Sequence, residues 1–317
     1  MVVRLCYGKE PRQRKVSYSV SDRPDLLVEI KIEPKSVVDT ERLMSALARM
    51  ASDNGAFGYS RNAKTGEVIV MGVDERALDA QIGALRSVHA IDILVGPPQV
   101  RYRETLACAV NIDYTHKKLM AGGTSQFARI KLRLEPNVDG TGNELKIEIV
   151  GDVLPKKFIP AIAKGVHSVW DAGVLIGFPM VDTTVTLYDG AYHELDSSAD
   201  AFESAARMAM REGLEKAGVK LLEPIMDVEV SAPGDLIGSV IGDINRRRGL
   251  VIGQEARDDD HVIRAQVPLA ELFGYQSDLR SIANGLARCA ICFSHYAEVP
   301  PGKNGPYNFP PAVGMRA

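Results

Sequence analysis

His193, in the segment Asp189–Ser198, carries an imidazole, a group that can hydrogen-bond or take part in acid–base chemistry. It lies between a predicted strand and a predicted helix, where an imidazole is by default solvated or locally bonded. Asp196, Ser197 or Ser198 can cap the following helix, so that part of the segment needs no functional explanation. We find no catalytic triad or paired carboxylates and expect no catalytic residue. The remaining histidines, which have no partner at metal-ligand spacing, are His89, His116, His167, His261 and His295.

Cys289 and Cys292 form a C-x-x-C motif of the kind that binds zinc or performs redox chemistry. The surrounding residues alternate as in a strand, and residues three apart on a strand point to opposite faces. Without a second cysteine or histidine pair, we expect neither a metal site nor a redox function. The chain has 4 cysteines among 317 residues, which disfavours a disulfide framework and favours a reducing cytoplasm.

A phosphate-binding loop of the form G-x-x-x-x-G-K-[ST] does not occur in the sequence. That motif supplies the backbone amides, lysine and hydroxyl that hold a triphosphate and its Mg²⁺. We therefore expect this chain to have no nucleotide cofactor, to hydrolyse no nucleotide and not to be an enzyme.

Two other segments could contact phosphate or RNA. Arg246, Arg247 and Arg248 precede Gly249 at the end of a predicted helix, where positive charge suits the helix dipole and glycine is expected as the left-handed cap. Three successive side chains cannot share one helix face, so a guanidinium either faces solvent or binds phosphate or a partner. The small residues of Ala121–Gln126 predict a hairpin turn, or a loop that lets the backbone approach an RNA groove.

Length and composition indicate a soluble chain of two or three domains. The chain is 45% apolar and 25% charged, which disfavours disorder. No uncharged apolar stretch reaches the roughly 18 residues of a membrane span, and the N-terminus lacks the apolar core of a secretory signal. The net charge of −3 is unevenly distributed, because residues 1–24 are basic. A polyanion would have to meet local patches and loops.

The elements that position these residues follow from periodicity. The same order, βαββαβ, is predicted near both ends of the chain, and it indicates two ferredoxin-like domains in which two helices cover a four-stranded antiparallel sheet. The predicted strands are 27–32, 57–61, 67–71, 90–95, 225–230, 250–256, 262–267 and 288–297. The first predicted helix begins near residues 36–39 and ends at Asn54–Gly55, and the other three are 74–88, 233–247 and 270–286.

A separate α+β middle domain is predicted between these two. Its predicted strands are 109–114, 127–135, 145–150 and 181–188, and its helices are 160–172 and 198–217. The joins are expected at Gly96–Pro98 and near Glu223–Pro224. The predicted organisation is a basic arm at 1–24, domains at 25–98, 99–222 and 223–300, and a tail at 301–317 rich in Pro and Gly.

Ten segments, in order, resemble the C-terminal half of translation elongation factor G, the ribosomal translocase. They are Tyr114–Lys118, Gly122–Ala128, Phe158–Ala161, Gly177–Pro179, Asp189–Ser198, Leu222–Met226, Gly238–Asp243, Arg246–Gly249, Val267–Tyr275 and Leu279–Ser281. The resemblance covers about residues 24–300. It implies the family's third, fourth and fifth domains, with a ribosomal-protein-S5-like domain between two ferredoxin-like ones.

The resemblance implies that the middle domain is a finger that enters the decoding region of the ribosome behind the tRNA–mRNA duplex. Two loops, which match Gly122–Gln126 and Gly190–Asp196, would form its tip. A histidine ring and a glutamine amide can bond ribose and phosphate groups irrespective of sequence. The residues expected to contact RNA on this basis are Gly122, Gly123, Thr124, Gln126 and His193.

The sequence also departs from the family. The GTP-binding and β-barrel domains with which the family begins do not occur here, so GTP and Mg²⁺ would act only through absent domains. The family's segment Gly-Met-Gly-Glu-Leu-His-Leu-Asp appears as Gly72–Asp79, with Arg76 and Ala77 in place of leucine and histidine. Ser125 replaces a glycine before Gln126, which stiffens the first tip loop.

Two functions follow as expectations. The first is a cytoplasmic elongation factor component that binds ribosomal RNA and proteins and supports tRNA–mRNA translocation, with a missing or separate GTPase domain and no membrane partner. The alternative is a free-standing paralogue without a GTPase, which binds ribosomes or RNA as a regulatory module. Small-molecule kinases also contain S5-like domains, but the sequence has no phosphate-binding loop to support that reading.

Overall fold

The computed structural model describes residues 26–36, 39–62, 65–119, 125–151, 153–257 and 260–300. They form two compact units. The smaller unit comprises Glu104–Lys220, and the larger unit comprises the described residues up to Arg103 and from Leu221 onward. The chain passes between the units within two strands, β5 (Arg103–Leu106) and β10 (Val219–Pro233).

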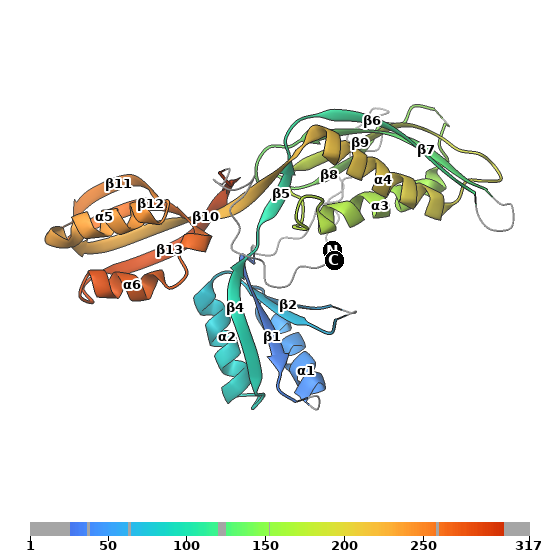
Figure 1. The fold of residues 1–317 in the computed structure, drawn as a ribbon. Coiled ribbons are helices and arrows are strands. Elements are labelled where there is room, and N and C mark those ends of the chain that lie inside the picture. Colours follow the sequence, from blue (N-terminus) through green and yellow to red (C-terminus); the bar gives the residue numbers. More distant parts are fainter. Residues whose placement is uncertain are drawn as a thin grey trace, which may run out of the picture. The chain divides into compact units, whose positions relative to one another are not determined.

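The larger unit begins with a βαββαβ domain, as the sequence predicts (Figure 1). Its strands pair in the order β2-β3-β1-β4, and every pair is antiparallel. In β1, Val28, Ile30 and Ile32 are buried and the residues between them are more exposed, which explains the alternation in the sequence. The elements are β1 (Val28–Pro34), α1 (Asp39–Asp53), β2 (Phe57–Arg61), β3 (Val68–Gly72), α2 (Glu75–Ser87) and β4 (Ile93–Val100).

Strand β4 differs from the prediction, which ended this strand at residue 95 and placed a join at Gly96–Pro98. The observed strand runs from Ile93 through both prolines to Val100. In its own sheet β4 is an edge strand that pairs only with β1. Because an edge strand needs a partner for its N–H groups on one side only, proline is tolerated there. The two prolines therefore lie within the strand, at the edge of the sheet.

The C-terminal part of the larger unit repeats the βαββαβ order, with the antiparallel strand order β11-β12-β10-β13. Its helices are shorter than predicted. Gly234–Leu236 forms a 3₁₀ turn before the first helix, and Gly274, with a φ of 72°, interrupts the second. Besides β10, the elements are α5 (Ile237–Arg246), β11 (Leu250–Arg257), β12 (Asp260–Pro268), α6 (Tyr275–Ile282) and β13 (Arg288–Glu298).

The smaller unit has a four-stranded sheet of order β6-β7-β9-β8, in which only β8 and β9 are parallel among the described pairs. Helices α3 and α4 cover one face of this sheet (Figure 1). The α+β fold class expected from the sequence is confirmed. Besides β5, the elements are β6 (Val110–Leu119), β7 (Ser125–Pro136), β8 (Glu144–Ile147), α3 (Ile159–Ala172), β9 (Thr183–Ala191) and α4 (Ala199–Ala217).

The two helices of the smaller unit pack closely at Gly165. A Cβ atom added there would lie 2.5 Å from the carbonyl oxygen of Glu203 and 2.8 Å from Cβ of Ala206. Such distances are shorter than van der Waals contact, so only glycine allows α3 to approach α4 this closely. The only tryptophan of the chain, Trp170 on α3, is buried in the same core.

Candidate functional site

Three strands of the smaller unit have an end on the same side of its sheet. Strand β6 ends at Leu119, β7 begins at Ser125 and β9 ends at Ala191. Leu119 lies opposite Ser125, so β6 and β7 form the predicted hairpin. We call these strand ends and the loop after β9, residues 117–119, 125–127 and 191–197, the tip. The predicted RNA contacts Gly122, Gly123 and Thr124 lie outside the described residues.

Gln126, the second residue of β7, lies opposite Lys118 on β6. Its Oε1 atom is 3.3 Å from Nε2 of His116, so that ring can donate a hydrogen bond to the amide oxygen. Within the described part of the chain, no residue accepts a hydrogen bond from the Gln126 amide nitrogen. An amide NH₂ group carries two donors, which suit phosphate and hydroxyl oxygens.

His193 lies in the loop between β9 and α4. Its Nδ1 atom is 3.1 Å from Oδ2 of Asp196, and its side chain is 56% exposed. A carboxylate at this distance favours a proton on Nδ1, which makes Nε2 the acceptor of the neutral ring. The imidazole is thus oriented by a neighbour while much of it faces solvent.

The loop that carries His193 is tied to β7 through Phe127. The Phe127 N–H donates to the carbonyl oxygen of Asp196 at 2.9 Å. The Ser197 hydroxyl donates to the carbonyl oxygen of Phe127 at 2.7 Å and accepts from the His193 N–H at 2.9 Å. Both backbone groups of one β7 residue are therefore bonded to the loop.

The two serines of this loop have different roles, which the sequence did not reveal. Ser198 is the cap of α4, and its Oγ accepts from the Ala201 N–H at 3.2 Å. Ser197 makes no capping bond and bridges the loop to β7 instead. The expectation that Asp196, Ser197 or Ser198 serves only as a helix cap is correct for Ser198 alone.

A pocket of about 480 Å³ lies at the tip. Gln126 and His193 both line it, so the structure brings together the two predicted RNA contacts that it describes. Lys117 extends over the ring of Phe127, with Nζ 5.8 Å from the ring centroid. The other lining residues are Lys118, Leu119, Ser125, Ala191, Tyr192 and Asp196.

Sequence reasoning missed two apolar side chains at the tip. Leu195 is 89% exposed and Leu119 is 79% exposed, although both are large and hydrophobic. The available signal was a leucine between charged residues in a loop that bears a histidine. Tyr192 was also missed; its ring lies 6.4 Å from that of Phe158, and this contact attaches the loop to the start of α3.

The sheet behind the tip carries paired charges. Arg129 on β7 donates to Asp113 on β6 at 2.8 Å, and Lys131 pairs with Asp189 on β9 at 2.8 Å. These hydrogen bonds lower the pKa of both aspartates below the usual range. Cations here are balanced by neighbouring carboxylates, unlike the lysines nearer the tip, Lys117 and Lys118, which are exposed.

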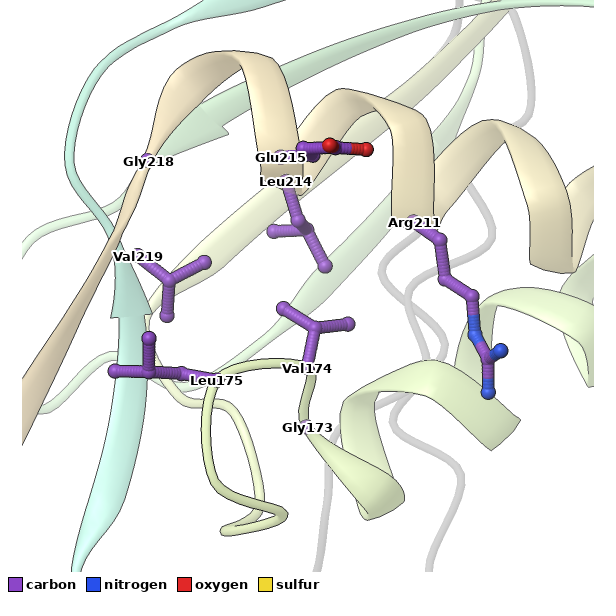
Figure 2. Close-up of a pocket in the computed structure, with 8 residues that line it drawn as sticks. All are labelled: Gly173, Val174, Leu175, Arg211, Leu214, Glu215, Gly218 and Val219. Carbon is purple, nitrogen blue, oxygen red and sulfur yellow. The ribbon is translucent and has the colours of Figure 1, made fainter.

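Near the start of β9, at the end of the smaller unit that we call the base, Glu104 on β5 is completely buried, and its carbonyl oxygen accepts from the Val181 N–H at 2.8 Å. Its two carboxylate oxygens accept from the backbone N–H groups of the five residues Val174–Phe178, at 2.7 to 3.1 Å. These bonds fix the loop that follows α3. The loop borders an apolar pocket of about 590 Å³ in which Val174, Leu175, Leu214 and Val219 converge (Figure 2).

The three arginines at the C-terminal end of α5 differ in their surroundings. Arg247 is 12% exposed and is bonded to Asp243 at 2.8 Å and to Asp278 at 2.5 Å. Arg248 pairs with buried Glu223 at 2.5 Å. Arg246 also pairs with Asp243, but its side chain is 73% exposed. Arg246 is thus the member of the three that is most accessible to phosphate.

The expected left-handed cap at Gly249 is wrong. The residue with the left-handed conformation is Arg248, whose φ is 59° and whose side chain pairs with Glu223. Gly249 is needed for another reason, because an added Cβ would lie 2.5 Å from Cγ2 of Ile244.

Burial and the charge of Glu223 also raise the pKa of nearby Tyr102 to about 12.

The C-x-x-C motif lies on β13, as predicted. Cys289 is opposite Val230 and packs against the core, whereas Cys292 is opposite Asp227 and is exposed. The two thiols thus differ in burial as expected of opposite strand faces. No group of three potential metal-binding side chains occurs among the described residues. None of the helices in the described ranges is long and apolar enough to span a membrane.

Three family models match consecutive parts of the chain. "Elongation Factor G, domain III" matches residues 23–97, "Elongation factor G, domain IV" matches residues 98–218, and "Elongation factor G C-terminus" matches residues 220–304. The middle match contains the tip and the base, and the other two contain the βαββαβ domains.

Individual relatives agree with these matches. Elongation factor G of Rhodopseudomonas palustris (strain BisB18) is 48% identical over 296 residues, which are 93% of this chain and 42% of the relative. That of Paracoccus denitrificans (strain Pd 1222) is 48% identical over 277 residues, 87% of this chain and 39% of the relative. A crystal structure of a protein from Thermus thermophilus is similar with a TM-score of 0.67 and 34% identity, over 89% of this chain and 42% of that one. The chain spans less than half the length of these proteins, and residues 23–304 belong to the elongation factor G family as its domain III, domain IV and C-terminal domain.

Proposed function

We propose that this chain acts in translation in the cytoplasm, where it binds the ribosome and supports the translocation of tRNA and mRNA. In this proposal the tip of the smaller unit enters the decoding region and contacts the tRNA–mRNA duplex. The names of the relatives and of the three matching family models support a role in elongation.

The observation that carries the proposal is the common position of Gln126 and His193. Both line one pocket at the tip. The Gln126 amide nitrogen is available as a donor, and the His193 ring presents Nε2 beside a largely exposed surface. A donor and an acceptor of this kind can bond ribose hydroxyls and phosphates of any sequence, as a factor that meets every codon requires.

Charge at the tip fits the same partner. Lys117 and Lys118 are exposed there, while the cations farther along the sheet are paired with aspartates. Contacts between a few lysines and phosphates release counterions and weaken as the salt concentration rises. This local attraction accounts for RNA binding by a chain with a net charge of −3. Exposed Arg246 is a candidate for a second ribosomal contact.

The mechanism we propose for this chain is steric and electrostatic. The tip binds the space that the tRNA leaves and thereby favours the advanced state of tRNA and mRNA over the earlier one. The chain itself makes and breaks no bond in this scheme. GTP and Mg²⁺ would be held by a GTPase domain outside this chain, encoded with it or provided as a separate subunit.

Ribosome co-sedimentation tests the proposal. The chain should pellet with ribosomes programmed with mRNA and tRNA, and less of it should pellet as the salt concentration rises. His193→Ala should weaken this binding about fivefold or more, the size expected for one hydrogen-bonding side chain. His295→Ala, at an exposed histidine of the larger unit, is the control and should bind as the wild type does. No association of the wild type at low salt would refute the proposal.

A second function is favoured by the segment Gly72–Asp79. Here Asp74 caps α2 by accepting from the Ala77 N–H at 2.7 Å, so the local fold is intact although Arg76 and Ala77 depart from the family's pattern. This combination supports a free-standing paralogue without a GTPase that binds ribosomes as a regulatory module. A stop codon and a ribosome-binding site directly upstream of Met1 in the genome would favour the paralogue. A GTPase domain in the same reading frame would exclude it.

A further inference from the structure

We propose that Ser197 is the positioning residue of the tip, which holds His193 in fixed register with the β7 residues that include Gln126. The inference deepens the proposed function, because it concerns how the two RNA-contacting side chains are kept together. It concerns a hydroxyl that the neighbouring helix does not use.

The geometry distinguishes Ser197 from a local turn residue. Its Oγ accepts from the His193 N–H at 2.9 Å and donates to the carbonyl oxygen of Phe127 at 2.7 Å. The first bond spans four residues and the second spans seventy. One hydroxyl therefore links the backbone of His193 directly to the backbone of the residue that follows Gln126.

The backbone hydrogen bonds around Ser197 do not replace the two bonds that its hydroxyl makes. The Ser197 N–H donates to the carbonyl oxygen of His193 at 3.0 Å, and the Phe127 N–H donates to that of Asp196 at 2.9 Å. These backbone bonds close the loop and attach it to β7, but neither satisfies the His193 N–H or the Phe127 carbonyl. A hydroxyl can donate and accept at once, which alanine cannot.

The arrangement also constrains the imidazole. Asp196, which lies next to Ser197, is within 3.1 Å of the His193 ring. Loss of the Ser197 bridge would free the loop between Tyr192 and Asp196 from β7 on the His193 side. The ring would then sample more orientations, so its entropic cost of binding RNA would rise.

Hydrogen exchange on the full chain tests the positioning role without a ribosome. In the wild type the His193 amide should exchange slowly for a residue in an exposed loop. Ser197→Ala should speed its exchange at least fivefold, whereas Ser197→Thr, which keeps the hydroxyl, should restore slow exchange. Ser198→Ala is the matched control: it should speed exchange at Ala201 and leave His193 unchanged, because Ser198 caps α4.

The same variants connect positioning to binding. Ser197→Ala should weaken ribosome co-sedimentation about fivefold, Ser197→Thr should restore it, and adding Ser197→Ala to His193→Ala should weaken it little further. Unchanged His193 exchange in Ser197→Ala, or fast exchange in Ser197→Thr as well, would overturn the inference. If His193 exchange responds as expected but the wild type does not bind ribosomes, the proposed function fails and the positioning role stands.

Discussion

Glu104 at the base of the smaller unit and His193 at its tip are both titratable side chains with a partner in a loop. Glu104 bonds to loop backbone and His193 to a loop carboxylate, but the two side chains differ in how accessible they are to solvent. Glu104 is fully buried, and five backbone N–H groups occupy its oxygens. The His193 ring is held by Asp196 alone among described side chains and stays 56% exposed. The comparison shows that the polar contacts of Glu104 are used up within the fold, whereas the His193 ring remains accessible to solvent.

Removal of Glu104 should have the largest effect on stability. Glu104→Ala removes the buried carboxylate that accepts from the five N–H groups of Val174–Phe178, and we expect the free energy of unfolding of the smaller unit to fall by about 3–5 kcal/mol. Urea unfolding followed by Trp170 fluorescence measures this, because the only tryptophan lies in that core. Glu144→Gln, at a partly exposed carboxylate on β8, is the control and should change stability by less than about 0.5 kcal/mol. A loss below about 1 kcal/mol for Glu104→Ala would contradict the contrast between base and tip.

Gly165→Ala should have the next largest effect. The added Cβ would lie 2.5 Å from the Glu203 carbonyl oxygen, so α3 must move away from α4 at a cost of about 1–3 kcal/mol. The same fluorescence measurement applies. Gly83→Ala on α2, where nothing lies within 4 Å of the new atom, should not destabilise its own domain. Calorimetry measures this control, because Trp170 lies in the smaller unit and does not report on α2. Equal stability of Gly165→Ala and wild type would show that the helices have room to separate.

A smaller effect should appear with pH. Arg129 and Lys131 lower the pKa of Asp113 and Asp189 below the ordinary value of 3.8. The unfolded chain thus binds protons more readily than the folded one, and the contribution of these pairs is complete above the ordinary pKa and is lost as the pH falls through the lower folded values. Because both carboxylates are exposed to solvent, the loss should be small. Asp113→Asn should reduce the acid sensitivity of the smaller unit, and an unchanged acid unfolding profile would contradict this account.

Substitutions at the tip should have the smallest effect on stability. His193→Ala and Leu195→Ala remove exposed side chains and should change the free energy of unfolding by less than about 0.5 kcal/mol. Their melting temperatures should match that of the wild type in calorimetry. A loss of more than about 2 kcal/mol for either variant would mean that the tip, like the base, serves the fold.

Local patterns predicted the elements better than the long-range contacts. Alternation located β1, and Asp74 marked the start of α2, because burial and capping depend on neighbouring residues. The helix predicted at 270–286 was too long, because periodicity does not register that Gly274 takes a left-handed conformation. The prediction ended β4 before two prolines that an edge strand tolerates.

The site shows the same limit. Gln126 and His193 were identified by the resemblance to a family, and a lone loop histidine would not have been chosen otherwise. Ser197 was named only as one of three possible helix caps, because its partner, Phe127, is seventy residues away in the sequence. Glu104 belongs to no motif, since its partners are backbone groups whose positions only the fold determines.

The central claim, that the tip binds RNA in the decoding region, is tested most directly by chemical footprinting. Ribosomes programmed with mRNA and tRNA are probed with and without the wild-type chain, Gln126→Ala and His193→Ala. The account predicts protection of decoding-region nucleotides by the wild type, and reduced protection by both variants at concentrations where each remains folded. Protection confined to other ribosomal sites, or full protection by both variants, would contradict it.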